Sequence, residues 1–246
     1  MSHFFVTSGQ ITGDELIILG DDVNHMKNVL RMRSGEAFTA ADENGMFYRC
    51  EVDVLDKSQV TAKILWKEEG SSELSSKIYL FQGLPKSDKM EMIIQKAVEL
   101  GAYEIVPVST KRAIVKLDAK KEASKLKRWQ AIAEGAAKQS GRMIVPQIHE
   151  VLSFKEALQM AKELDINVIP YECAKGMDGT REIFGSIKPG MSVGIFIGPE
   201  GGFEESEVEE AKTLGVHPVT LGKRILRTET AGLTTLSILM YLLEEE

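Results

Sequence analysis

The possible folds of this chain are limited above all by the stretch from Val193 to Leu243. It opens with an apolar run, Val193 to Ile197, which continues into a glycine-rich turn at 198–202 and then into an amphipathic helix starting near Phe203. A buried strand, a glycine-rich turn and a helix in succession are typical of α/β proteins, in which ligands bind outside the carboxyl ends of the strands. We therefore expect this turn to form the floor of a ligand pocket.

The residues around the turn indicate which ligand charge it would accept. The following helix opens with Glu204, Glu205 and Glu207, which complement the helix dipole and would repel a polyphosphate. Pro199 also removes one backbone donor from the turn. Neither the P-loop pattern nor G-x-G-x-x-G occurs, so the main support for a nucleotide triphosphate or a dinucleotide is missing. A neutral or partly cationic ligand fits better.

A second motif follows closely, a basic and turn-rich loop that leads into an apolar helix. The motifs IGPEGGF at 197–203 and LGKRILRTETA at 221–231 together resemble the last two motifs of the SPOUT class of S-adenosylmethionine-dependent RNA methyltransferases. Within that class the chain is similar to the enzymes that methylate N3 of a uridine in 16S rRNA of the small ribosomal subunit. The resemblance implies S-adenosylmethionine as cofactor, 16S rRNA as partner and a homodimer.

The resemblance also implies a fold. It predicts an α/β domain at 74–246, with a SPOUT-type parallel sheet and a C-terminal trefoil knot, preceded at 1–70 by a small PUA-like β-barrel that binds RNA. The knot follows from the resemblance alone, since knots are rare exceptions among folds.

The residue pattern independently divides the chain in two. Short runs of period two predict strands in the first part, with Asn44-Gly45 as a hairpin turn, and a helix-like segment lies at 22–31. The polar segment 68–76 is rich in serine and marks a linker. The predicted strands are Glu15 to Leu19, Glu36 to Ala41, Phe47 to Leu55 and Gln59 to Leu65.

After the linker, strands alternate with helices, which predicts a mainly parallel sheet with helices on both faces. We expect helices with capping boxes at Asp88 with Glu91 and at Ser153 with Glu156. The expected strands are Ile78 to Gln82, Ile105 to Val108, Ile166 to Ile169 and Val216 to Leu221.

The charge is unevenly distributed along the chain. The net charge is −7, yet residues 111–142 hold ten lysines and arginines against three acidic residues, a net +7 that leaves −14 for the rest. Such asymmetry is typical of a surface that attracts a polyanion. A long helix, Asp118 to Gln139, carries much of this excess on one face, and a solvated face is the ordinary alternative. Residues 139–142, Gln-Ser-Gly-Arg, match the Gln-Ser-x-Arg element of the family, which favours RNA binding.

The candidate RNA contacts come from this segment and from a basic cluster in the first part of the chain, for which a solvated loop is the alternative. They are Arg31, Arg33, Arg112, Lys121, Lys125, Arg128, Gln139 and Arg142.

The cofactor candidates lie on three loops. Glycines let the backbone approach adenine and ribose, and Leu221, Ile225 and Leu226 offer apolar walls. A first loop near 170–172 is implied by the resemblance. The predicted set is Pro170, Tyr171, Gly198, Pro199, Glu200, Gly201, Gly202, Leu221, Gly222, Ile225 and Leu226.

The catalytic candidates follow from the chemistry of uracil, whose N3 must lose a proton before it becomes a nucleophile. Arg142 and Arg227 could stabilise the resulting anion, and Glu200 or Glu229 could accept the proton. Glu229 is equally placed to cap the last helix.

Other features restrict the class of protein. Cys50 and Cys173 are far apart with no histidine cluster nearby, so neither a disulfide framework nor a metal site is expected. We expect a cytoplasmic protein, since the N-terminus does not resemble a signal peptide and Ala231 to Leu243 is too short to span a membrane. Two other functions stay open: a non-catalytic RNA-binding or ribosome-assembly factor, and a sister SPOUT activity on tRNA or at a ribose hydroxyl.

Overall fold

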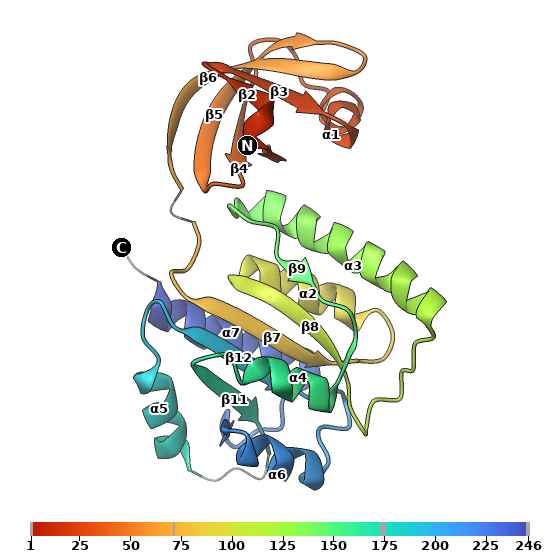
Figure 1. Ribbon diagram of the computed structural model, residues 1–246, viewed down its shortest axis with the longest axis vertical. Coiled ribbons are helices and arrows are strands. Elements are labelled where there is room, and N and C mark those ends of the chain that lie inside the picture. Colours follow the sequence, from red (N-terminus) through yellow and green to blue (C-terminus); the bar gives the residue numbers. More distant parts are fainter. Residues whose placement is uncertain (1, 71, 173–175, 245–246) are drawn as a thin grey trace. The chain divides into compact units, whose positions relative to one another are not determined.

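A computed structural model describes residues 2–70, 72–172 and 176–244. The chain divides into two compact units (Figure 1). The N-terminal unit comprises Met1–Glu73 and Ala137–Val145, and the C-terminal unit comprises Leu74–Ala136 and Pro146–Glu246. Cys173 lies outside the described residues. The sequence did not indicate that the short segment at 137–145 belongs with the N-terminal unit.

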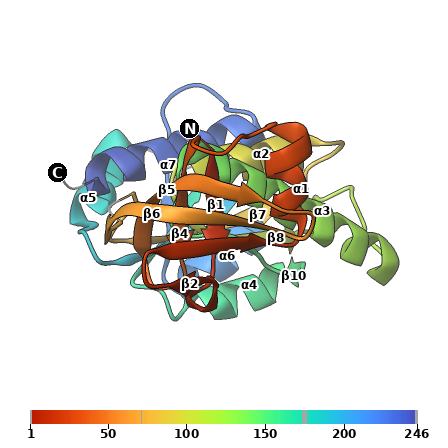
Figure 2. The ribbon, with the colours of Figure 1, turned by 90° about the horizontal axis from the view of Figure 1, so that it is seen from above.

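The N-terminal unit is built on a six-stranded sheet with the strand order β1-β4-β5-β6-β3-β2 (Figures 1 and 2). The predicted hairpin is confirmed: Gly45 has a φ of 79°, and the Asp42 carboxylate accepts hydrogen bonds from the backbone of Asn44 and Met46. Each predicted strand is present, with small shifts at its ends. The strands are β1 (His3–Val6), β2 (Ile11–Thr12), β3 (Glu15–Leu19), β4 (Ala37–Asp42), β5 (Met46–Leu55) and β6 (Gln59–Glu69).

The predicted helix-like segment of this unit is confirmed, but it ends unusually. It begins as α1 (Asp21–Asn24) and continues as one π-helical turn, η2 (His25–Val29). The chain leaves this turn through Arg31, whose φ of 55° lies in the left-handed region that favours glycine. A short 3-10 helix, η1 (Ser8–Gln10), lies between β1 and β2.

The C-terminal unit contains a parallel sheet with the strand order β10-β8-β7-β12-β11-β13, and β9 pairs with β8. The predicted parallel sheet is therefore confirmed. Its central strands pack through Phe81 and Phe196, whose stacked rings lie 4.4 Å apart. The strands are β7 (Lys77–Gly83), β8 (Ala102–Ser109), β9 (Gln147–Ile148), β10 (Leu152–Ser153), β11 (Ile166–Pro170), β12 (Ser192–Ile197) and β13 (Val216–Val219).

Helices cover both faces of this sheet, because successive side chains of a strand point to opposite faces. Residues of α4 and α6 share a buried cluster with Phe81 and Phe196. On the other face, α7 approaches Leu80 and Ile197 through Gly232. The helices are α2 (Lys89–Glu99), α3 (Ala119–Ser140), α4 (Phe154–Ala161), α5 (Met177–Ser186), α6 (Glu205–Thr213) and α7 (Thr228–Leu243).

One of the two predicted capping boxes is wrong. Ser153 and Glu156 form the expected reciprocal pair at the start of α4. At α2, the Asp88 side chain makes no capping hydrogen bond within the described part of the chain, and Glu91 instead accepts a hydrogen bond from Arg128 at 2.7 Å. A cation from α3 therefore takes the place of the backbone donor that a capping box requires.

The segment at 137–145 is held in the N-terminal unit by two ion pairs. The Lys138 ammonium lies 2.7 Å from Asp22, and the Arg142 guanidinium donates to Glu73. Within the described residues, no helix has the length and apolar character that a membrane span requires.

Candidate functional site

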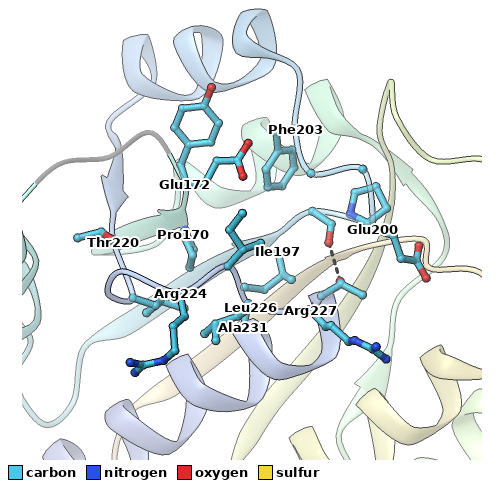
Figure 3. A pocket seen from close by; sticks show the side chains of 18 of the residues that line it. Pro170, Glu172, Ile197, Glu200, Phe203, Thr220, Arg224, Leu226, Arg227 and Ala231 are labelled. Carbon is cyan, nitrogen blue, oxygen red and sulfur yellow. Dashed lines mark hydrogen bonds between the residues drawn. The ribbon is translucent and has the colours of Figure 1, made fainter.

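A cavity of about 550 Å³ lies at the carboxyl ends of three neighbouring strands, β11, β12 and β13. Three loops line it, at 170–172, 197–203 and 220–228 (Figure 3). The structure brings together every residue of the predicted cofactor-binding set, although their part in binding stays a prediction. These residues are Pro170, Tyr171, Gly198, Pro199, Glu200, Gly201, Gly202, Leu221, Gly222, Ile225 and Leu226.

The loop after β12 is a tight turn that depends on its glycines. Gly202 has a φ of 67°, and its N–H donates to the Pro199 carbonyl at 2.8 Å. A Cβ atom added to Gly198 would lie 2.9 Å from the carbonyl carbon of Gly202, so a larger residue would open the turn. The turn leads directly into α6, where the Glu207 carboxylate accepts from the backbone of Glu204 and of Lys111.

The loop after β13 exposes apolar surface at the cavity. Ile225 lines the cavity and is 84% exposed. Gly222 has a φ of 109°, and a Cβ atom there would meet nothing within 4 Å. Exposed apolar surface beside open space is what a ligand with a flat apolar face would cover.

A group of charged residues lies where the cavity meets the start of α2. The Lys89 ammonium, which lines the cavity, lies 2.9 Å from Glu200 and 3.4 Å from Glu229. Burial by itself would raise the pKa of Glu200, but hydrogen bonds from Lys89 and from backbone N–H groups, including that of Lys86, hold it below its ordinary value. Glu200 is therefore ionised at neutral pH and already paired, which makes it a poor proton acceptor.

Arg112 lines the same cavity, although the sequence analysis placed it among the RNA contacts. Its Nε donates to Glu204 at 2.9 Å, and its Nη1 donates to the Gly201 carbonyl at 3.0 Å. The Arg112 side chain therefore stabilises the glycine-rich turn.

The catalytic candidates come from both units. Arg227 is exposed and lines the cavity just before α7. Glu229, in the first turn of α7, lies 3.4 Å from the Lys89 ammonium, and its side chain is 14% exposed. Arg142 belongs to the N-terminal unit, where it is 4% exposed and its Nε donates to Glu73 at 2.8 Å. The roles of all three stay predictions.

The other RNA candidates are exposed or nearly so, but several have carboxylate partners. Arg128 lies 2.7 Å from Glu91, and Lys125 lies 4.0 Å from the same carboxylate. Lys121 pairs with Asp118 one turn away. Arg31, Arg33 and Gln139 are exposed.

Among the residues that line the cavity but were not predicted as site residues, Lys89 and Thr228 matter most for the contacts described above and below. Lys89 opens the helix that follows β7, and Thr228 opens α7. The signal for Lys89 was available, since it follows a strand whose carboxyl end lies at the same edge of the sheet. Across the ranges 2–70, 72–172 and 176–244, no group of three or more histidine, cysteine, aspartate or glutamate residues could hold a metal ion.

Comparison with known proteins defines the class first. Residues 72–240 match the model of an RNA methyltransferase domain, and residues 18–65 match that of an RNA methyltransferase PUA domain. The chain belongs to this family of RNA methyltransferases.

Individual relatives narrow the comparison. The chain is 40% identical to the ribosomal RNA small subunit methyltransferase E of Bacillus subtilis (strain 168), over 91% of this chain and 89% of that protein. A crystal structure of the methyltransferase of the same name from Neisseria gonorrhoeae, bound to S-adenosyl methionine, is 34% identical over 98% of both chains, with a TM-score of 0.84. A putative methyltransferase of Legionella pneumophila, in complex with the same cofactor, is 31% identical over 97% of this chain and 96% of that one, with a TM-score of 0.85.

Proposed function

We propose that this protein methylates N3 of a uridine in 16S rRNA of the small ribosomal subunit, with S-adenosylmethionine as the methyl donor. One observation carries the proposal: three loops that are separate in the sequence, each named in advance, line one cavity at the carboxyl ends of parallel strands. Two similarities support the same conclusion. Relatives are named for small-subunit rRNA, one of them solved with S-adenosyl methionine bound, and a putative methyltransferase is solved with the same cofactor.

The residues around the cavity suit this cofactor. The volume of about 550 Å³ is in the range of ordinary small-molecule sites. Ile225 and Leu226 would cover adenine, while the open space at Gly222 admits the ribose. The carboxylates of Glu172 and Glu200 suit a partly cationic ligand, since both line the cavity. The cofactor would supply an electrophilic methyl group, so the chain itself needs only to bind, orient and deprotonate the uracil.

The proton on uracil N3 is the chemical obstacle that the chain must remove. In our proposal the Glu229 carboxylate accepts this proton, and Arg227 stabilises the anionic base together with the positive end of the 16-residue helix α7. The Glu229 Oε2 atom is buried and lies 3.4 Å from the Lys89 ammonium, which is closer to Glu200, at 2.9 Å. Lys89 therefore holds Glu229 more loosely than it holds Glu200. A well-placed general base contributes roughly 10² to 10⁴ in rate. Arg142 would position a phosphate of the RNA.

We propose a homodimer formed through α7, together with the trefoil knot that the resemblance implies. The outward face of α7 carries large apolar side chains, of which Tyr241 is 82% and Leu242 43% exposed. We expect light scattering to give twice the chain mass at micromolar concentration. A monomer that still methylates RNA would contradict the dimer.

Two measurements test the activity. Calorimetry should detect S-adenosylmethionine binding to the intact protein, whereas an RNA-binding or assembly factor without catalysis would bind none. Mass spectrometry of nucleosides from 16S rRNA should then show 3-methyluridine missing in a deletion strain and restored by the wild-type chain. A missing modification in tRNA or at a ribose hydroxyl would assign the protein to a sister activity.

A further inference from the structure

A series of buried hydrogen bonds connects strand β7, which does not line the cavity, to two of the loops that do. Gln82, near the end of β7, is fully buried, yet it carries a polar side chain in the middle of the sheet. Its Nε2 donates to the Thr228 hydroxyl at 2.9 Å and to the Gly83 carbonyl at 2.9 Å. The Thr228 hydroxyl in turn donates to the Gly198 carbonyl at 2.6 Å (Figure 3).

The direction of these bonds is fixed by the groups themselves. Only the amide nitrogen of Gln82 can donate to the Gly83 carbonyl, so the orientation of the amide follows from that contact. A hydroxyl has a single hydrogen, and because Thr228 accepts from Gln82, its own hydrogen is left for Gly198. Gln82 therefore determines where Thr228 donates, and Thr228 determines where the first carbonyl of the glycine-rich turn points.

These hydrogen bonds connect two of the loops that line the cavity. Gly198 begins the turn after β12, and Thr228 ends the loop after β13. Close packing at the same point reinforces the link, since a Cβ atom on Gly83 would lie 2.6 Å from Pro199 Cδ. On α7, Gly232 also lies beside Gln82, where an added Cβ atom would make an ordinary contact with Oε1 at 3.7 Å.

We infer that Gln82 is a positioning residue, which acts through Thr228 to hold the 198–203 turn and the start of α7 at the separation that the cofactor requires. The inference rests on the proposed function, because it names S-adenosylmethionine as the ligand. Gln82 does not line the cavity. It preorganises the cavity, and a buried polar network of this kind is costly to break at any one member.

The test uses four variants of the full chain. Thr228→Val removes the hydroxyl at nearly constant volume, Thr228→Ser keeps it, and Gln82→Met removes the amide at similar length. Thr235→Val is the matched control: Thr235 is also a buried threonine of α7, but its hydroxyl donates to Ala231 within the helix. Calorimetry measures cofactor affinity, and thermal unfolding measures stability.

We expect Thr228→Val and Gln82→Met each to weaken S-adenosylmethionine binding by about tenfold, since each leaves buried polar groups unpaired. Thr228→Ser should bind within about twofold of the wild type, and Thr235→Val should lose stability without losing affinity. The double variant should bind S-adenosylmethionine no more weakly than the weaker-binding single variant, because both changes break the same series of hydrogen bonds.

The outcomes separate the inference from the function it rests on. If the wild type binds the cofactor and Thr228→Val binds equally well, the positioning role is wrong while the proposed function stands. If the wild type binds none, the proposed function fails first. Should Gln82→Met fail to fold, the comparison of Thr228→Val with Thr228→Ser and Thr235→Val still decides.

Discussion

The cavity loops and the basic segment at 111–142 are both rich in the residues expected of an RNA methyltransferase, but they differ in what those residues contact. In the loops, Gly222 faces open space and Ile225 is largely exposed. In the basic segment, charged side chains already bind carboxylates of the same chain, as Arg112 binds Glu204 and Arg128 binds Glu91. The loops are arranged for a ligand, whereas part of the basic charge is used internally.

The difference shows that a count of charges identifies ligand-binding residues less well than a sequence motif does. The net charge of +7 at 111–142 says nothing about partners that come from other segments. An exposed ion pair contributes little to stability, and a phosphate can compete for its cation. A buried pair such as Arg142 with Glu73 is much harder to divert. The segment therefore contains two kinds of cation, and mutation can tell them apart.

The largest effect should come from the loops. We expect Gly222→Val to weaken S-adenosylmethionine binding by at least about 100-fold, roughly 2.7 kcal/mol. A branched residue is strained at the φ of 109° and fills the space in front of the cavity. Gly201→Val should also impair binding, but there the added Cβ would lie 3.2 Å from Arg112, so the turn itself would shift.

The control for this change is Gly215→Val. Gly215 also has a positive φ, of 84°, and open space around its missing side chain, but it does not line the cavity. Calorimetry and thermal unfolding should show similar strain in both variants and lost binding only in Gly222→Val. Equal cofactor affinity in the two would remove the loop after β13 from the site.

A smaller effect is expected from Arg142→Ala in the basic segment. The guanidinium is 4% exposed and donates to Glu73, whose side chain is 26% exposed. Because one partner is partly solvated, we expect a loss of about 2 kcal/mol in the free energy of unfolding, below the usual cost of breaking a fully buried pair. Denaturant unfolding measures it, and Glu73→Gln should lose a similar amount.

The same variant tests the predicted part of Arg142 in catalysis. If Arg142 also holds the RNA in line with the methyl group, turnover should fall by more than RNA affinity in protein that is still folded. Normal turnover in the folded variant would leave Arg142 with its structural ion pair alone.

Much of the fold was predictable because the signals are local. The hairpin at Asn44-Gly45, the capping box at Ser153 and the alternation of strands and helices each depend on residues within a few positions of one another. The glycine-rich turn after β12 was predictable for a related reason, since parallel strands bring their carboxyl ends to one edge. The loop at 170–172 was predicted from the family resemblance.

The rest depends on contacts between distant parts of the chain, for which the sequence carries no local signal. Glu73 is 69 residues from Arg142, and Gln82 is 146 residues from Thr228. The capping box expected at Asp88 was wrong for the same reason, because Glu91 binds a cation of α3. Glu200 shows how such contacts change chemistry: Lys89 and backbone donors lower its pKa and remove it as a base.

The smallest effects should come from the exposed cations of α3, where Arg128 is 63% and Lys125 37% exposed at the side chain. If they bind phosphate, each change to alanine should reduce the slope of log affinity against log salt by about 0.7 for single-stranded RNA. The loss should be the same for all RNA sequences, since phosphate contacts carry no base information. S-adenosylmethionine affinity should not change, because neither side chain lines the cavity. Lys212→Ala on α6 is a suitable control, because its ammonium also pairs with a carboxylate, that of Glu209 on the same helix, whereas Arg128 pairs with Glu91 of α2. Salt slopes that match this control would mean that Glu91 retains both cations and that the basic face of α3 is solvated surface. Reduced slopes would mean that RNA displaces the carboxylate, and Glu91→Gln should then strengthen RNA binding.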